Sequence, residues 1–206
     1  MRVVSSINKT TAALLLAAFL IVPLESGYAL QRRAASGEVG GINYVVPADY
    51  RASASKGGLY VEASLPDWGP WQYTQPGWDD HLQILVTESL GESISTMWGR
   101  LYDGTPRVPA KQYVIVSTHR IEPDLTVLTM ASGDEVFLPD QDRTVLPEGF
   151  LVCGQPKPAV FPHASCAYYF NEGAQRWQVR FGRQFVRDFK DIRAKAQNFI
   201  HQFEER

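Results

Sequence analysis

The chain has 206 residues, of which 12% are aromatic and 13 are prolines, and its formal net charge is −2 at pH 7. This composition is typical of a packed, turn-rich domain and excludes a disordered chain. The basic residues are spread along the sequence without forming a basic stripe, which argues against nucleic-acid binding.

The N-terminus has the order of a secretory signal peptide. Arg2 and Lys9 accompany an apolar run over residues 11–24, and the small residues Gly27 and Ala29 follow it at the spacing that signal peptidase requires. The apolar run is shorter than the roughly 20 residues of a membrane-spanning helix. We therefore predict a periplasmic protein cleaved after Ala29. The alternative is an uncleaved segment that anchors the protein in the inner membrane through residues 11–24.

Removal of residues 1–29 leaves enough chain for one domain that buries about 70% of its unfolded surface. It also changes the formal net charge from −2 to about −3. Residues 30–41 contain small residues and glycines and predict a flexible leader. Residues 42–206 then form a single domain.

Strand patterns dominate this domain. Residues 41–50 contain a short β-branched and aromatic run that ends at a proline. Residues 57–68 and 81–90 alternate between apolar and polar side chains, as half-buried strands do. In residues 57–68, Leu59 falls on one face while Tyr60 and Glu62 fall on the other.

Three further segments predict strands and hairpins. Residues 112–121 read as a strand, whereas residues 93–109 are ambiguous and could contain a strand. Residues 125–140 and 165–181 each have the form of a hairpin with a glycine-bearing turn. In the second arm of the latter, Trp177, Val179 and Phe181 face one side, and Arg176, Gln178 and Arg180 face the other.

Near residue 184 the period of the apolar residues changes to that of a helix. Apolar side chains recur at three- and four-residue steps to the end of the chain, at Phe185, Phe189, Ile192, Ala196, Phe199 and Phe203. This wide stripe needs a cover, which a sheet face can supply. The fold class that we predict is α+β, a mostly antiparallel sheet with one C-terminal amphipathic helix packed on it.

Cys153 and Cys166 are the only cysteines in the chain. In an exported protein, two cysteines beside strand-like sequence most simply form a disulfide. His163 leaves two weaker alternatives, a metal site and a thiol nucleophile, but the spacing fits no compact zinc motif. In an oxidising compartment, the second cysteine would also pair with a free thiol and block it as a nucleophile. We therefore predict a structural disulfide, with no metal and no cofactor.

The segment 66–81 is the most unusual part of the sequence. It contains Trp68, Trp71, Tyr73 and Trp78 among prolines, glycines and aspartates. Tryptophan and tyrosine are typical anchors of protein interfaces, so these four residues are the candidate binding site. In the competing interpretation, the segment is a proline-rich crossover whose tryptophans fold over the edge of the core.

The order of these features resembles a group of uncharacterised exported proteobacterial proteins. The resemblance rests on an N-terminal apolar segment, VVPADY at residues 45–50, LPDWGP at residues 65–70, two late cysteines, and WQVRF at residues 177–181 followed by a helix. Some members of that group look like immunity proteins of secreted effectors. The resemblance implies a binding protein and supplies no catalytic residues.

Two functions follow as hypotheses. The first is a non-enzymatic periplasmic protein that binds another envelope or secreted protein, either as an inhibitor of immunity type or as an accessory of an envelope assembly. The second is binding or hydrolysis of peptidoglycan or another glycan through the tryptophan-rich segment 66–81. No nucleic-acid partner is expected, and a membrane is involved only if the N-terminal segment stays uncleaved.

Overall fold

A computed structural model of the chain divides it into two units, residues 1–31 and 32–206. It describes residues 33–72, 78–91, 93–94, 96–98, 114–122, 125–139, 149–155 and 164–205. The predicted signal peptide over residues 1–29 lies outside these described residues, as do Tyr73 and His163.

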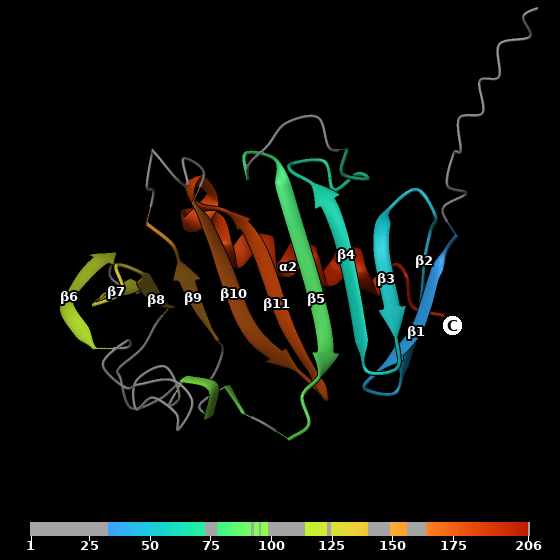
Figure 1. Ribbon diagram of the computed structural model, residues 1–206, viewed down its shortest axis with the longest axis horizontal. Helices are drawn as coiled ribbons and strands as arrows, with labels where there is room; N and C mark the ends of the chain where they lie inside the picture. Colours follow the sequence, from blue (N-terminus) through green and yellow to red (C-terminus); the bar gives the residue numbers. More distant parts are fainter. Residues whose placement is uncertain are drawn as a thin grey trace, which may run out of the picture. The chain divides into compact units, whose positions relative to one another are not determined.

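Within the described residues, nine strands form one sheet in the order β3-β4-β5-β11-β10-β9-β8-β7-β6, in which all neighbours are antiparallel (Figure 1). The strands are β3 (Arg51–Ser55), β4 (Gly58–Ser64), β5 (His81–Glu88), β6 (Ile115–Glu122), β7 (Leu125–Met130), β8 (Glu135–Pro139), β9 (Phe150–Cys153), β10 (Ser165–Glu172) and β11 (Gln175–Gly182). Both predicted hairpins, β7–β8 and β10–β11, are confirmed.

One face of this sheet is covered by the C-terminal helix. The chain leaves β11 through the 3₁₀ helix η2 (Arg183–Asp188) and continues as α2 (Phe189–His201). The apolar side chains of α2 are buried in one core with side chains from the back face of the sheet, such as Val61 on β4, Ile84 on β5 and Val179 on β11. Figure 1 shows α2 running across the back of β11, β5 and β4. The predicted α+β class is therefore confirmed.

Residues 35–46 correct one expectation. The predicted flexible leader contains β1 (Ala35–Val39), which pairs with β2 (Ile42–Val46) in a separate hairpin. Gly40 and Gly41, which suggested flexibility, form its turn at φ 61° and 84°, a region where glycine costs least. The buried amide of Gln175 fixes the hairpin by donating to the Val39 carbonyl and the Tyr44 hydroxyl, both at 2.8 Å.

A second, smaller core lies on the opposite face of β7, β8 and β9. Residues 94 and 96–98 are helical, which contradicts a strand in this part of the ambiguous segment 93–109, whereas residues 99–109 lie outside the described residues. Ile94 and Trp98, four positions apart on this turn, are both buried, and the Trp98 ring meets Phe150 edge-to-face at 5.4 Å. Residues at this spacing share one side of a helix, which explains why both reach the same core.

Candidate functional site

The side of the sheet opposite α2, here called the front face, carries the candidate site. Alternation along β4, β5 and β11 sends every second side chain to this face. Leu85 on β5 is 36% exposed, and on β11 Gln178 is half-buried and Arg180 exposed. Within the described residues, the back face of these three strands is buried under α2, whereas their front face reaches solvent at Leu85 and Arg180.

At the upper end of β5, an imidazole lies between two tryptophans. The His81 ring stacks on Trp71 with centroids 3.9 Å apart and an interplanar angle of 15°. It also stacks on Trp78 at 4.9 Å and 16°. Two parallel indoles this close cannot share one face of an imidazole, so His81 lies between them. The described residues Trp71 and Trp78 of the connection between β4 and β5 therefore lie on the front face.

A buried carboxylate supports this stack from β4. Glu62 is 3% exposed, and its Oε2 lies 3.4 Å from Nε2 of His81 and 3.5 Å from a guanidinium nitrogen of Arg51. The hydroxyl of Tyr60 donates a hydrogen bond to the other carboxylate oxygen. A buried carboxylate needs such partners to offset its lost hydration. Arg51, Tyr60, Glu62, Trp71, Trp78, His81 and Arg180 form one contact chain, which we call the front-face cluster.

Burial sets the protonation of this cluster. The pKa of His81 is lowered because the effect of burial exceeds the opposing effect of the charge and hydrogen bond of Glu62. Burial and the hydrogen bond to Glu62 raise the pKa of Tyr60, which therefore remains a neutral donor. A general base must reach a substrate proton, whereas both ring faces of His81 are covered and the residue is 7% exposed. The geometry of His81 fits support of the two tryptophans better than proton transfer.

Trp78 is held in place by the end of β11. Gln184 donates to the carbonyls of Trp78 and Asp79, both at 3.2 Å. A side chain at Gly182 would collide with the Trp78 carbonyl oxygen, so glycine is required there for this close approach. The guanidinium of Arg180 lies 5.1 Å from the centre of the Trp78 ring, within the range of a cation–π contact. Trp78 and Arg180 therefore form one unit on the front face.

Three of the four aromatic residues predicted as the binding site are described, and they do not all lie together. Trp71 and Trp78 come together on His81, but Trp71 is only 6% exposed. Trp68 packs instead against the core under α2, with its ring 5.7 Å from that of Phe199. Tyr73 lies outside the described residues. Of the described candidates on the front face, Trp78 is the one that remains half-exposed.

Trp78 and Arg180 line a hollow of about 470 Å³ on the front face, which we call the front-face hollow. Its other lining residues are Ser132, Gly133, Asp134, Val152, Gly154, Gln155, Ala164, Ser165, Ala167 and Tyr169. Ala167 is 8% exposed, and Tyr169 beside it on β10 is a half-buried ring. A depression of this size with aromatic walls and a few polar groups has the usual form of a binding site.

The predicted disulfide is confirmed and lies beside this hollow. Cys153 on β9 and Cys166 on β10 are direct cross-strand partners, bonded through sulfur and fully buried. The residues next to them, Gly154 and Ser165, line the hollow. The disulfide therefore fixes the two ends of the segment 154–165 at the edge of the hollow, and a role for these cysteines as metal ligands or nucleophile is excluded while the bond is formed.

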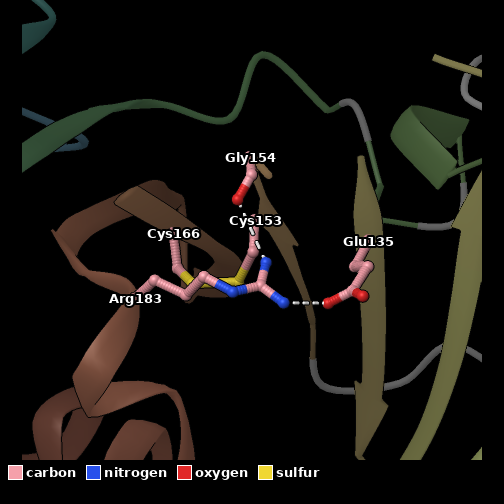
Figure 2. Close-up of a disulfide and its surroundings, with 5 residues drawn as sticks. All are labelled: Glu135, Cys153, Gly154, Cys166 and Arg183. Atoms are coloured by element: carbon pink, nitrogen blue, oxygen red, sulfur yellow. Dashed lines mark hydrogen bonds and ion pairs between the residues drawn. A yellow bond between two sulfur atoms is a disulfide. The ribbon is translucent and has the colours of Figure 1, made fainter. Parts of the chain in front are cut away.

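Arg183 makes further contacts beside the disulfide. Figure 2 shows the Arg183 side chain passing alongside the disulfide toward β8. Its guanidinium donates to the Gly154 carbonyl at 3.0 Å and to the carboxylate of Glu135. Arg183 and Glu135 are 24% and 18% exposed in their side chains, so water screens this pair less than a surface pair. The start of η2 is thereby tied to β8 and β9.

A second histidine is paired at the far end of α2. Burial lowers the pKa of His201, but the hydrogen bond and charge of Glu204 and the charge of Glu172 outweigh this effect, so the pKa is raised. Its Nε2 lies 3.5 Å from Glu172 on β10. His201 therefore links α2 to the sheet most strongly when it is protonated.

The part of the chain that the structure describes contains no helix that is long and apolar enough to cross a membrane. The same residues bring together no group of three or more histidine, cysteine, aspartate or glutamate side chains suited to a metal ion.

Comparison with known proteins places this arrangement among known folds. No family model matches the chain, and no curated protein matches its sequence. The structure resembles Smlt3025, an immunity protein of the Stenotrophomonas maltophilia type IV secretion system, with a TM-score of 0.59 and 12% identity over 85% of this chain and 94% of that protein. It also matches FrpD, an iron-regulated outer membrane lipoprotein of Neisseria meningitidis, at a TM-score of 0.46 and 9% identity over 84% of this chain and 93% of that one.

The first of these likenesses shows a shared fold. It agrees with the resemblance to exported immunity-type proteins that the sequence motifs indicate. The fold and the disulfide together define the class of protein as a disulfide-linked α+β domain built on an antiparallel sheet.

Proposed function

We propose that the chain is an exported, non-enzymatic protein that binds another protein through the front face of its sheet. The observation that carries this proposal is the contrast between the two faces of β4, β5 and β11. The back face is sealed by α2, whereas the front face presents Leu85, Gln178 and the front-face hollow. An exposed face with an aromatic anchor and an arginine has the composition of a protein interface.

The fold similarity supports the kind of partner. Smlt3025 is an immunity protein of a secretion system, and an immunity-type protein acts by binding. By this analogy, the partner is a secreted or envelope protein, and the chain inhibits it or accompanies it in an envelope assembly. Export is supported by the N-terminal pattern and by a buried disulfide, which forms in an oxidising compartment such as the periplasm.

The test begins with the partner in its native compartment. Tagged protein is crosslinked in the periplasm of the native cell, the captured protein is identified by mass spectrometry, and the purified pair is measured by calorimetry. Leu85→Glu places a negative charge in the middle of the front face and should weaken binding at least tenfold. Ala194→Glu, at an exposed position of α2, is the matched control and should leave the dissociation constant unchanged.

The reverse result would contradict the proposal. If Ala194→Glu weakens binding and Leu85→Glu does not, the partner binds α2 and not the front face. Both variants should unfold at the temperature of the parent protein, because both positions are exposed. If chitooligosaccharide or peptidoglycan fragments bind the front face and no protein partner does, the glycan hypothesis replaces this one.

A further inference from the structure

We propose that the front-face hollow takes a carboxylate side chain of the partner, which binds Arg180 against the Trp78 ring. This inference rests on the proposed function and names the chemistry of the partner: an acidic segment of a protein. Its basis is the charge distribution of the front face and the geometry of one arginine.

Arginines reach the front face from two strands, since alternation places Arg51, Arg176 and Arg180 on it in β3 and β11. Carboxylates accompany them. Glu62 is 3% exposed and already meets Arg51 and His81, Asp80 acts on the charge of His81, and Asp134 lines the hollow. The charge of the face is therefore mixed, and the arginine patch favours a negative partner locally, where an arginine stands without a carboxylate partner.

Arg180 is the residue of this patch that borders the hollow. Within the described part of the chain, no carboxylate lies within ion-pairing distance of its guanidinium. Its contact with Trp78 is through the ring, 5.1 Å from the guanidinium carbon to the ring centre. A guanidinium held over an aromatic ring loses side-chain freedom but keeps its N–H donors. Those donors can bind a carboxylate in the two-point geometry that arginine favours.

The rest of the hollow fits a side chain that enters from outside. Its floor includes the small residues Ala167, Ser165 and Gly154, which leave room beside Arg180. Among the described lining residues, the carboxylate is that of Asp134, which accepts a hydrogen bond from Ser132 at 3.0 Å in the turn between β7 and β8. This hydrogen bond orients Asp134 within its own turn but leaves its negative charge, so the ligand carboxylate is expected at the Arg180 side of the hollow.

The experiment uses a defined probe, because the partner is unidentified. A capped pentapeptide with three glutamates is titrated into the ¹⁵N-labelled exported protein, and the Trp78 indole N–H and the Arg180 Nε–H signals are followed by NMR. The acidic peptide should shift both signals in a saturable and salt-sensitive manner. The same peptide with three glutamines should leave them in place.

Substitutions assign the effect to Arg180. Arg180→Gln should weaken peptide binding about tenfold, as expected for the loss of a charge-assisted hydrogen bond, and Arg180→Lys should retain part of it. Arg120→Gln is the matched control, since Arg120 is an exposed arginine on β6 that does not line the hollow. Equal shifts with the glutamine peptide, or unchanged binding in Arg180→Gln, would overturn the inference. So would chitooligosaccharide that shifts the same signals when the acidic peptide does not.

The outcomes also separate this inference from the proposed function. If Leu85→Glu abolishes partner binding while the acidic peptide produces no shift, the front face binds a protein but the carboxylate inference is wrong. If the peptide binds at Arg180 and no protein partner engages the front face, the carboxylate inference holds and the proposed function fails.

Discussion

The disulfide between Cys153 and Cys166 allows a quantitative prediction of stability. It closes a loop with a sequence separation of 13 between two paired strands. In the chain-entropy model, closing a loop of this length restricts the unfolded state and stabilises the protein by about 3 kcal/mol. For a domain of this size, each 1 kcal/mol shifts the melting temperature by roughly 2–4 °C. The variant Cys153→Ala/Cys166→Ala should therefore melt roughly 6–12 °C lower.

The assay is urea unfolding of the oxidised protein and of the double-alanine variant under the same conditions. Both sulfurs are fully buried, so reductant should leave the native disulfide intact and react only when the protein unfolds. The native circular dichroism spectrum should be the same for both proteins, because β9 and β10 also pair through their backbones. A loss of less than 1 kcal/mol, or rapid reduction of the native protein, would refute this reasoning.

Three further predictions concern the stack, the histidines and the N-terminus. Trp71→Ala should lower the free energy of unfolding by about 3–5 kcal/mol, as expected for a buried aromatic side chain. Trp78→Ala should lower it less and weaken partner binding more. Equal losses of stability in the two variants would contradict this difference. Because burial lowers the pKa of His81, its contribution to stability is present above its unfolded pKa of about 6.5 and is lost as the pH falls below that value. The raised pKa of His201 has the opposite sign, since its contribution is present below about 6.5 and is lost as the pH rises. From pH 7.5 to 5.5, chemical denaturation should therefore show a smaller fall in the free energy of unfolding for His81→Gln than for the parent protein, and a larger fall for His201→Gln; the reverse order would refute the assignment. The intact mass of the periplasmic protein should correspond to a chain that starts at Leu30 and is two hydrogens lighter than the reduced form, and a mass that includes residues 1–29 would instead favour the anchor.

The parts of the fold that the sequence predicts are those where alternation is regular. Leu59, Ile84 and Val179 mark strands whose apolar side faces α2, and the helical period from Phe185 marks the element that covers them. Both hairpins of the second half were predicted because a glycine-bearing turn separates two strand patterns in each. These signals are local, so the sequence alone contains them.

The errors come from segments whose structure depends on tertiary contacts. β3 has the sequence RASAS, which carries no strong strand preference, and it forms because it pairs with β4. β1 was predicted as leader because its residues are small and polar, but the hairpin is held by Gln175, which is distant in sequence. The turn with Ile94 and Trp98 is helical because both side chains reach the second core. Pairing and packing of this kind leave no local pattern.

The candidate site contains residues that the sequence already singles out. The tryptophan-rich segment pointed to Trp78, and alternation along β11 placed Arg180 on the polar side. The sequence could not show that His81 joins Trp71 to Trp78, nor that Trp68 turns toward Phe199 on the other side of the sheet. These contacts join residues to strands and to a helix that are distant from them in the sequence or on opposite faces of the sheet, which no spacing of aromatic residues determines.

The central claim is that a protein partner binds the front face, and photo-crosslinking in living cells tests it most directly. A photoreactive residue replaces Gln178 on the front face in one strain and Asn198, an exposed residue of α2, in another. The account predicts one crosslinked partner from position 178 and none from position 198. Crosslinking to the same partner from position 198 alone would contradict it.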